Sequence, residues 1–263
     1  MKPASAASEK HTIPAVNKAV ELLRVLAEEP GETTTKSLAM QLGIPRTTCY
    51  RILRSLVARD WVRPLEGGRH VLSLGLLPLL KPLRQVEHLG EMLQPVLEEL
   101  TAGAQMSSKI TVHQGDSAVT IARCESPQRT SVAAKLGASF HLVYGSSGAV
   151  LLSDLKTDEV QSIVKRAPGE CWAREQPADV FKRIKDVQTK GWCADLGTWN
   201  KSVHAISAPL HGGKGGIAAA ITLLGFPEEL PPNQLAGPAR LLLEAVRQGE
   251  KRLRAAGKAS GEK

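Results

Sequence analysis

The apolar residues between positions 35 and 59 follow the pattern of two short helices around a tight turn. Leu38 and Leu42 lie on one face of the first helix. Gly43 follows directly, as at the end of many helices, and Pro45 stands where the first residue of a second helix is expected. The second helix has an apolar stripe at helical spacing, formed by Cys49, Ile52, Leu53, Leu56 and Val57. The pattern therefore predicts a helix-turn-helix unit.

The other face of this second helix is rich in cations and hydrogen-bond donors. It carries Arg46, Thr47, Tyr50, Arg51 and Arg54. Arginine can bind guanine through two hydrogen bonds, and threonine and tyrosine can reach phosphates or base edges. We therefore expect this face to enter the major groove of double-stranded DNA. The alternative is a solvated basic face in a small helical bundle, because helix-turn-helix patterns are short and degenerate.

A helix before this unit and a hairpin after it complete the predicted N-terminal domain. Pro14 opens the earlier helix, whose expected apolar stripe is Val16, Ala19, Val20, Leu23, Leu26 and Ala27. Residues 33–35 are threonines and supply an N-cap for the next helix. Beyond the recognition helix, the β-prone runs 61–63 and 70–73 flank two glycines. Three helices and a hairpin predict a winged helix-turn-helix, whose wing would lie over the phosphate backbone or the minor groove. The predicted DNA-binding residues are Thr35, Arg46, Thr47, Thr48, Tyr50, Arg51, Arg54, Arg63 and Arg69.

Residues 74–103 are predicted to be helical with breaks at Pro78 and Pro82. The leucines between positions 76 and 80 are too many for one face of a monomer, so a linker helix that packs on a partner chain is expected. Burial against its own domain is the alternative. Further on, Leu89, Leu93, Val96, Leu97 and Leu100 form a stripe that would lie on the following domain.

The second half of the chain mixes strands and helices. Strands are expected at 109–113, 118–122, 131–134, 192–195, 203–210 and 217–224, and helices at 145–154, 177–190 and 233–254. Hairpin-like pairs of strands interrupted by helices predict an α+β domain with an antiparallel sheet.

The charge of the chain is concentrated in its N-terminal part. Residues 1–85 hold 13 Lys and Arg residues against 7 Asp and Glu residues, a net charge of +6, whereas the remainder holds 21 against 19, a net charge of +2. A basic end and a nearly neutral body indicate that only the N-terminal part meets a polyanion. A basic surface that merely aids solubility is the alternative.

Other compositional features exclude several classes of protein. Four distant cysteines without a CxxC motif, Cys49, Cys124, Cys171 and Cys193, are expected to be free thiols in a reducing compartment, and no metal site or cofactor is expected. The chain has no apolar run of transmembrane length and no apolar signal-peptide core in residues 1–12, which are expected to form a disordered leader. A cytoplasmic protein without a membrane partner is the expectation.

Five segments, taken in order, resemble the IclR-type bacterial transcription regulators. They are AVNKAVELL at 15–23, LAMQLGIPRTTCYRIL at 38–53, RCESP at 123–127, GAVLL at 148–152 and VHAISAPL at 203–210. The resemblance covers residues 13–254 and implies a winged helix-turn-helix at 13–75, linker helices at 76–103 and a GAF-like effector-binding domain at 104–254. A flexible tail would follow at 255–263. It also implies that the protein acts as a dimer or tetramer.

The chain departs from the family pattern at three places. The His-Ala-Thr that often precedes the Gly-Lys-Ala loop reads Val143-Tyr144-Gly145, with Ala149 at the lysine position. The Glu-x-x-Gly-Val stretch is replaced at 200–203, and the Ser-x-Ser of the last strand reads Thr222-Leu223-Leu224. All three departures fall near the expected ligand pocket, so the resemblance implies the fold but no particular effector.

Two glycine-rich stretches suggest other chemistry. Residues 212–216 (GGKGG) lack the Ser or Thr of a phosphate-binding P-loop and lie between two strands, so a mobile hairpin tip is the preferred interpretation. Residues 145–148 (GSSG) do not form a G-x-S-x-G elbow, and no His and Asp complete a triad. A Gly/Ser loop that opens a helix can instead bind a carboxylate through its N–H groups, although an unoccupied structural turn remains an alternative.

The function predicted from the sequence is sequence-specific DNA binding controlled by a small organic acid, and no catalytic residue is assigned. The predicted effector-binding residues are Gly145, Ser146, Ser147, Gly148, Ala149, Asp195, Ala205, Ser207, Thr222 and Leu224. Asp195 is placed at the cavity by the resemblance, and it could also simply cap a turn. The alternative function is a small-molecule sensor or enzyme that does not act on DNA, although such a protein would not need the basic N-terminal part.

Overall fold

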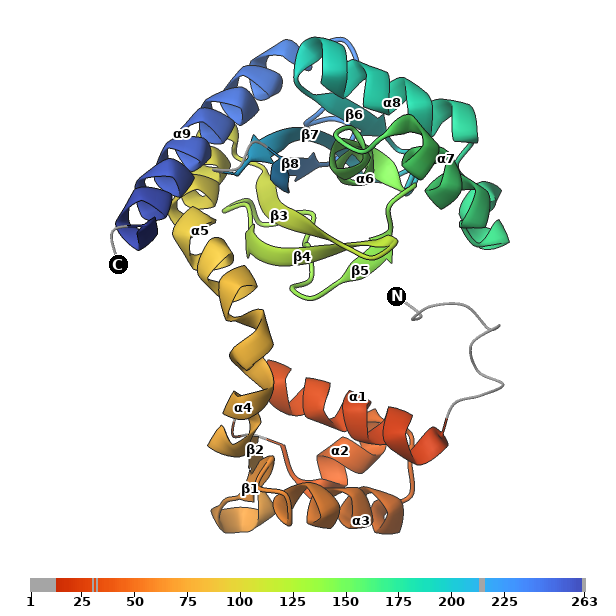
Figure 1. The fold of residues 1–263 in the computed structure, drawn as a ribbon. Coiled ribbons are helices and arrows are strands. Elements are labelled where there is room, and N and C mark those ends of the chain that lie inside the picture. The colour runs from red at the N-terminus through yellow and green to blue at the C-terminus, as the bar shows by residue number, and fades with distance from the viewer. Residues whose placement is uncertain (1–12, 30, 32, 213–215, 262–263) are drawn as a thin grey trace. The chain divides into compact units, whose positions relative to one another are not determined.

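The computed structural model describes residues 13–29, 31, 33–212 and 216–261 of the 263-residue chain. The predictions for the leader at 1–12 and for most of the hairpin tip at 212–216 therefore fall outside the described residues. The chain divides into two compact units, Met1–Arg84 and Gln85–Lys263, which are considered separately below (Figure 1).

The first unit has the predicted winged helix-turn-helix. It contains α1 (Pro14–Glu28), α2 (Thr35–Gln41) and α3 (Arg46–Val57), followed by the antiparallel hairpin of β1 (Val62–Pro64) and β2 (His70–Leu72). A single 3-10 turn at Glu66–Gly68 forms the tip of the hairpin. The core lies where the three helices and the hairpin meet, and its fully buried side chains include Leu22, Leu26, Leu38, Leu53 and Val62.

Three details of the first unit differ from the sequence prediction. The buried face of α1 is centred on Leu22 and Leu26, whereas Val16 is 54% exposed and Val20 is exposed as well, because the helix is rotated relative to the expected stripe. Pro45 has an extended ψ of 139° and is the N-cap of α3, so the helix begins one residue later than predicted. Val57 is exposed because it ends α3, where the chain turns toward β1.

The segment after the hairpin consists of short helical turns. These are Leu74–Leu76, α4 (Leu77–Leu80) and Lys81–Leu83, with Pro78 and Pro82 in the first turn of the second and third. The predicted breaks at these prolines are confirmed, since proline is accepted in a first turn but not in a helix interior. The long helix α5 (Arg84–Ala104) follows and continues through Pro95.

The second unit is built on a six-stranded antiparallel sheet with the strand order β5-β4-β3-β8-β7-β6. The strands are β3 (Ser107–Gln114), β4 (Ser117–Cys124), β5 (Ser139–His141), β6 (Cys193–Leu196), β7 (His204–His211) and β8 (Ile217–Gly225). The helices are α6 (Gly145–Leu152), α7 (Thr157–Arg166), α8 (Pro177–Lys190) and α9 (Ala236–Gly261). The predicted α+β class with an antiparallel sheet is confirmed.

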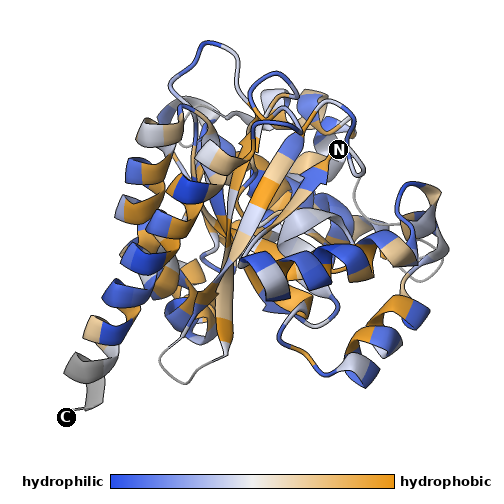
Figure 2. Ribbon diagram, turned by 90° about the horizontal axis from the view of Figure 1, so that it is seen from above, coloured by the Kyte–Doolittle hydropathy of each residue, from blue (hydrophilic) through white to orange (hydrophobic). Residues whose placement is uncertain are grey.

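Helices cover both faces of this sheet and create two apolar cores. On one face, α5 and α9 pack against Ile110, Ile206 and Ile221. On the other face, α6, α7 and α8 pack against Ala118 and Ala220. In Figure 2 the strands are coloured largely as apolar residues, while the helices that flank them also carry hydrophilic residues on their outer sides. Alternate residues of β3, β7 and β8 therefore face either the α5/α9 side or the α6 side.

Several predicted elements of the second unit are corrected. Residues 131–134 do not form a strand, and the edge strand is β5, which pairs with the start of β4. Helix α7 was not predicted, although Asp158 and Glu159 in its first turn and Lys165 and Arg166 in its last turn suit the helix dipole. Helix α9 continues to Gly261, through residues expected to be a flexible tail.

Candidate DNA-binding surface and effector site

The turn between α2 and α3 is fixed by backbone groups and by a capping box. Thr34 and Ser37 cap the start of α2 reciprocally, since each side chain accepts a hydrogen bond from the backbone N–H of the other. Gly43 ends α2 in the left-handed region (φ 62°), and the Ile44 N–H donates to the Ala39 carbonyl at 3.0 Å. These contacts and the buried stripe of α3 leave only one face of α3 open.

The open face of α3 carries the predicted DNA-binding residues. Arg46, Thr47, Tyr50, Arg51 and Arg54 are all exposed, and Thr48 is partly buried. The Tyr50 side chain is 54% exposed although it could have packed inside. Among the described residues, none of the three arginines forms an ion pair. The face therefore offers three uncompensated positive charges and a phenol to the surroundings.

The hairpin is attached to the segment that precedes α2. The His70 N–H donates to the Thr33 carbonyl at 2.9 Å, and Thr34 forms an isolated antiparallel bridge with Arg69. The Arg69 guanidinium donates to the carbonyls of Glu66 at 3.2 Å and Gly31 at 3.4 Å. Arg63 lies exposed on β1. The two predicted wing arginines thus differ: Arg69 is held by its own unit, whereas Arg63 extends into solvent. Thr35 is the first residue of α2 and is partly buried.

In the second unit, the strand residues predicted to bind the effector lie together on the α6-facing side of the sheet. The registers place them in two neighbouring cross-strand rows. One row is Asp195, Ala205 and Leu224, and the other is Ser207 and Thr222 with Cys193, which was not among the predicted residues. All six side chains are buried. Asp195 also accepts the Thr198 N–H at 2.9 Å, so it caps a turn as well as lining this face.

Residues 145–148 are the first turn of α6 rather than a loop before it. Gly148 approaches the preceding strand so closely that a Cβ there would lie 2.1 Å from the Leu142 carbonyl oxygen, which requires glycine. The Ser146 hydroxyl is 2.8 Å from the Ser207 hydroxyl, which is in turn 2.8 Å from the Thr222 hydroxyl. A buried chain of three hydroxyl groups therefore connects α6, β7 and β8. Ser147 and Ala149 are buried beside it.

The start of α6 already has an anionic partner within the chain. The Gly145 N–H donates to Oε1 of Glu175 at 3.2 Å, and Oε2 of Glu175 accepts from Nη2 of Arg183 at 2.6 Å. Both side chains of this ion pair are buried. Burial raises the pKa of Glu175, an effect that outweighs the opposing influence of the Arg183 guanidinium. The Gly145 N–H is therefore already taken by Glu175, and effector binding by the N–H groups of residues 145–148 stays a prediction.

A second ionisable group on the α6-facing side was also missed. Lys109 of β3 lies opposite Thr222 of β8 in the sheet register. Its ammonium group is 4.7 Å from the centre of the Phe140 ring, a cation–π distance. Burial lowers the pKa of Lys109 to about 8. No carboxylate of the described residues lies within ion-pair distance of it.

Comparisons with known proteins identify the family. The profile described as the C-terminal part of the bacterial transcriptional regulator IclR matches residues 84–249, and the profile of the IclR helix-turn-helix domain matches residues 15–66. The chain belongs to the IclR family of bacterial transcriptional regulators.

Curated relatives and solved structures of the IclR family agree with this assignment. The chain is 20% identical over 237 residues to the HTH-type transcriptional repressor AllR of Escherichia coli K12, covering 89% of this chain and 88% of AllR. The fold is similar to that of the Thermotoga maritima IclR, with a TM-score of 0.70, 16% identity and coverage of 91% and 98% of the two chains. It is also similar to an IclR homolog from Microbacterium hydrocarbonoxydans complexed with 4-hydroxybenzoate, with a TM-score of 0.68, 17% identity and coverage of 92% and 99%.

One departure from the IclR pattern places aromatic rings beside α6. Tyr144, directly before the helix, lies 4.0 Å from Trp199 between ring centres. Arg174 donates to the Trp199 carbonyl at 2.9 Å and so fixes the segment that carries this ring. Tyr144 directly precedes Gly145, so the ring pair lies at the start of α6.

The sequence analysis missed Arg183 and Lys109, and the two residues differ in how far the sequence could have indicated their role. Arg183 occupies the apolar stripe of α8 with Val180, Ile184 and Val187, and a cation in a buried stripe requires a counter-ion. That pattern could have predicted a buried acid near α8. Lys109 is one polar position in an otherwise ordinary strand, and only the sheet register shows which residues surround it.

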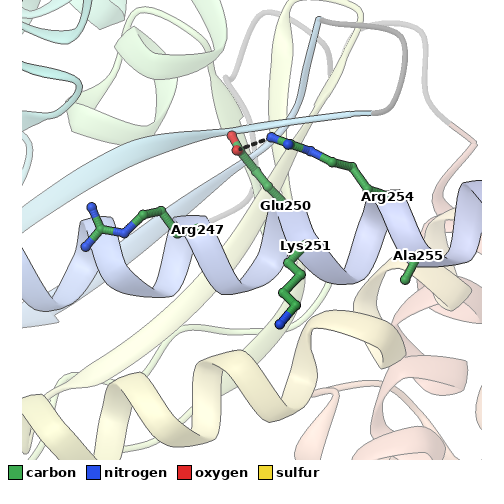
Figure 3. Close-up of a pocket in the computed structure, with 5 residues that line it drawn as sticks. All are labelled: Arg247, Glu250, Lys251, Arg254 and Ala255. Carbon is green, nitrogen blue, oxygen red and sulfur yellow. Dashed lines mark hydrogen bonds and ion pairs between the residues drawn. The ribbon is translucent and has the colours of Figure 1, made fainter.

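A hollow of about 480 Å³ lies on the surface of α9 and is separate from these residues (Figure 3). Arg247, Glu250, Lys251, Arg254 and Ala255 line it. Glu250 accepts from Arg254 at 3.1 Å and is 3.0 Å from His211, so its charge is already partnered. The hollow is formed by one helix face and contains none of the predicted effector-binding residues.

Other expectations concern disulfides, metals and membranes. The four cysteines are all free, as predicted. Within the part of the chain that the structure describes, no cluster of three or more metal-ligating side chains occurs. None of the helices described is both long and apolar enough to cross a bilayer.

Proposed function

We propose that this protein binds a specific DNA operator through the open face of α3 and that a small organic acid in its second unit changes this binding. The observation that carries the DNA-binding part is that one face of α3 exposes three arginines that form no ion pair with any described residue, while its opposite face is buried in the core. Arg46, Tyr50 and Arg54 project along one line of the helix, and Thr47 and Arg51 along the next. Such a face matches base edges and flanking phosphates in a major groove.

The wing would contribute contacts to the DNA backbone. Arg63 is exposed and has no ion-pair partner among the described residues. Arg69 would have to leave the carbonyls of Glu66 and Gly31 in order to reach a phosphate. Arg63 is therefore the stronger candidate for a phosphate contact, and it would add affinity without sequence preference.

The effector is proposed to bind on the α6-facing side of the sheet. The polar residues of this face are surrounded by buried apolar ones such as Ala205 and Leu224, a mixture typical of small-molecule sites. The relative from Microbacterium hydrocarbonoxydans has been solved with 4-hydroxybenzoate, a small aromatic acid. A similar chemical class would suit this site.

In vitro selection tests the function directly. The full-length chain is used to enrich double-stranded DNA from a random pool, and binding of the enriched sequence is then compared with that of a shuffled sequence at fixed physiological salt. We expect an inverted repeat that binds about 10³-fold more tightly than the shuffled DNA, or better. Enrichment of no sequence, with binding that depends only on salt, would favour the sensor or enzyme that does not act on DNA.

The regulatory part has its own test. An acid that binds one arrangement of the protein better than another must change operator affinity, and operator DNA must change the affinity for the acid by the same factor. Calorimetric titrations of the acid with and without operator measure both values. If the affinity for the acid were the same with and without operator, the acid would not regulate DNA binding, and the proposed DNA-binding function would be unaffected.

We also propose that the protein acts as a homodimer or larger assembly. Exposed apolar side chains gather in the first unit, on α1 and in residues 74–83; they include Ile13, Val16, Val20, Leu74, Leu77, Leu79, Leu80 and Leu83. Leu74, for example, is 78% exposed. Monomers seldom expose so much apolar surface in a small region, and two recognition helices would be needed to read an inverted repeat.

Replacing Leu79 and Leu80 together by aspartate should therefore convert the assembly to monomers at micromolar concentration. Light scattering coupled to size-exclusion chromatography gives the mass. Leu196→Asp is a matched control, because Leu196 is also exposed but lies at the end of β6. A wild-type protein that is monomeric and still binds the inverted repeat would rule out this assembly.

A further inference from the structure

The α6-facing side of the sheet holds one cation that no acid of the described residues compensates. Arg123 lies opposite Lys109 in the register of β3 and β4, but Arg123 forms an ion pair with Glu125 at 2.9 Å and also donates to the Ala134 carbonyl. The ammonium group of Lys109, by contrast, lies over the Phe140 ring. The net charge of Lys109, Arg123 and Glu125 is thus +1. A partly buried ammonium group is stabilised when an anion binds beside it.

The other positive feature of this face is not available to a ligand. Glu175 already accepts the Gly145 N–H at the start of α6, and Arg183 holds that carboxylate in place. An incoming carboxylate at α6 would lie close to Glu175 and would meet its negative charge in a buried environment, which is costly. The anionic end of an effector is therefore disfavoured at the start of α6.

A buried hydroxyl group near Lys109 also lacks a partner. Thr111 lies two residues further along β3, so it points to the same side of the sheet, and its side chain is fully buried. Its Oγ1 atom makes no hydrogen bond within the described structure. Buried hydroxyl groups are normally hydrogen-bonded, so the Thr111 hydroxyl is available to a polar group of a ligand.

We propose that Lys109 is the residue that receives the anionic group of the effector, with Phe140 on one side of the ammonium and Thr222 on the other. The inference rests on the proposed function, since it assumes that the second unit binds a small organic acid. It reverses the orientation expected from the sequence: the acid group lies at β3, and the carbon skeleton extends across β8 toward Ala205 and Leu224. A single uncompensated cation favours a monocarboxylate over a dicarboxylate.

The test compares two acids with their neutral counterparts. Calorimetry with the full-length protein measures binding of benzoate, benzyl alcohol, butyrate and butanol. Wild-type protein should bind at least one of the acids more tightly than the matching alcohol. Lys109→Met should weaken binding of that acid about tenfold or more, the usual loss for a hydrogen bond to a charged group, and should leave binding of the alcohol nearly unchanged. Lys109→Arg should retain most of the acid affinity.

Two further measurements separate this role from a structural one. Lys182→Met removes an exposed lysine from α8 and should leave acid binding unchanged. At pH 8, where Lys109 is only partly protonated, Lys109 should take up protons when the carboxylate binds, which appears as a dependence of the measured heat on the buffer. This dependence should disappear in Lys109→Met. Arg123, which lies opposite Lys109 in the register, and its ion-pair partner Glu125 both remain in that variant.

Two results would overturn the proposal. The first is that neither acid binds the wild-type protein, and the second is that Lys109→Met binds the acid as tightly as the wild type. Operator binding, measured without any acid in the same preparations, distinguishes these outcomes from a failure of the proposed function. A protein that binds its operator but shows either result would remain a DNA-binding regulator with a different effector site.

Discussion

Replacing Arg46 and Arg51 together by alanine should abolish discrimination between the operator and a shuffled sequence. Each arginine that binds a guanine through two hydrogen bonds contributes about 1–3 kcal/mol, or about tenfold to a hundredfold in affinity. Both residues are exposed on α3, and neither is held by an ion pair in the described structure, so their loss should not disturb the fold. Fluorescence anisotropy with labelled operator and shuffled DNA measures the two affinities.

Two single variants serve as comparisons for this experiment. Arg63→Ala on the wing should weaken binding to both sequences by a similar factor and reduce the salt dependence of binding, as expected for a lost phosphate contact. Arg24→Ala, on α1, breaks an exposed ion pair with Glu21 and should change neither affinity. If the folded Arg46/Arg51 double variant kept its preference for the operator, α3 would not be the element that reads the sequence.

Glu175→Gln should destabilise the second unit by about 3–5 kcal/mol, the usual cost of removing one partner from a buried ion pair. The Arg183 guanidinium would remain buried without a counter-ion, and its Nε atom already lacks a partner in the described structure. Glutamine keeps an oxygen that can accept the Gly145 N–H, so the substitution isolates the lost charge from the lost helix cap. Urea unfolding followed by tryptophan fluorescence suits the measurement, because Trp172, Trp192 and Trp199 all lie in this unit.

An exposed ion pair in the same unit provides the control. Asp116 and Arg166 form two hydrogen bonds at the surface, where solvent screens the interaction. The carboxylate of Asp116 beside this guanidinium has a lowered pKa, but an exposed pair of this kind contributes less than about 1 kcal/mol. Asp116→Asn should therefore change stability little. If both substitutions had the same small effect, Glu175 would not be the counter-ion on which the start of α6 depends.

The first unit was largely predictable because its signals are local. The stripe from Cys49 to Leu56 and the turn at Gly43 define the helix-turn-helix within 15 residues. The same holds for β7 and β8, whose long apolar runs are central strands of the sheet. The error at 131–134 has the opposite cause. β-Prone residues alone do not make a strand, and it is residues 139–141 that pair with the start of β4 as β5.

The effector site was predictable only in part because it depends on which strands become neighbours. The family resemblance placed Asp195 at the cavity, and Ser207 and Thr222 were predicted beside it. The registers of β6, β7 and β8 do bring these residues together. An anion was expected at the start of α6 because a Gly/Ser loop that opens a helix can bind a carboxylate. Glu175 lies 30 residues from Gly145 along the chain, and nothing local to either residue indicates that they are in contact.

The hydrogen bonds that connect the hydroxyl groups of Ser146, Ser207 and Thr222 have a donor-to-acceptor direction. Each hydroxyl group has one proton to donate, and two hydrogen bonds of 2.8 Å connect the three groups. One proton is therefore left for a partner other than these three hydroxyl groups. That proton is at Ser146 when donation runs from Thr222 toward α6, at Thr222 when it runs the other way, and at Ser207 when both neighbours donate to it. A carboxylate that accepts from Thr222 would select the second order, in which the Ser146 hydroxyl in the first turn of α6 donates to Ser207. A bound acid could thus be sensed at α6 through proton order alone, without movement of any heavy atom.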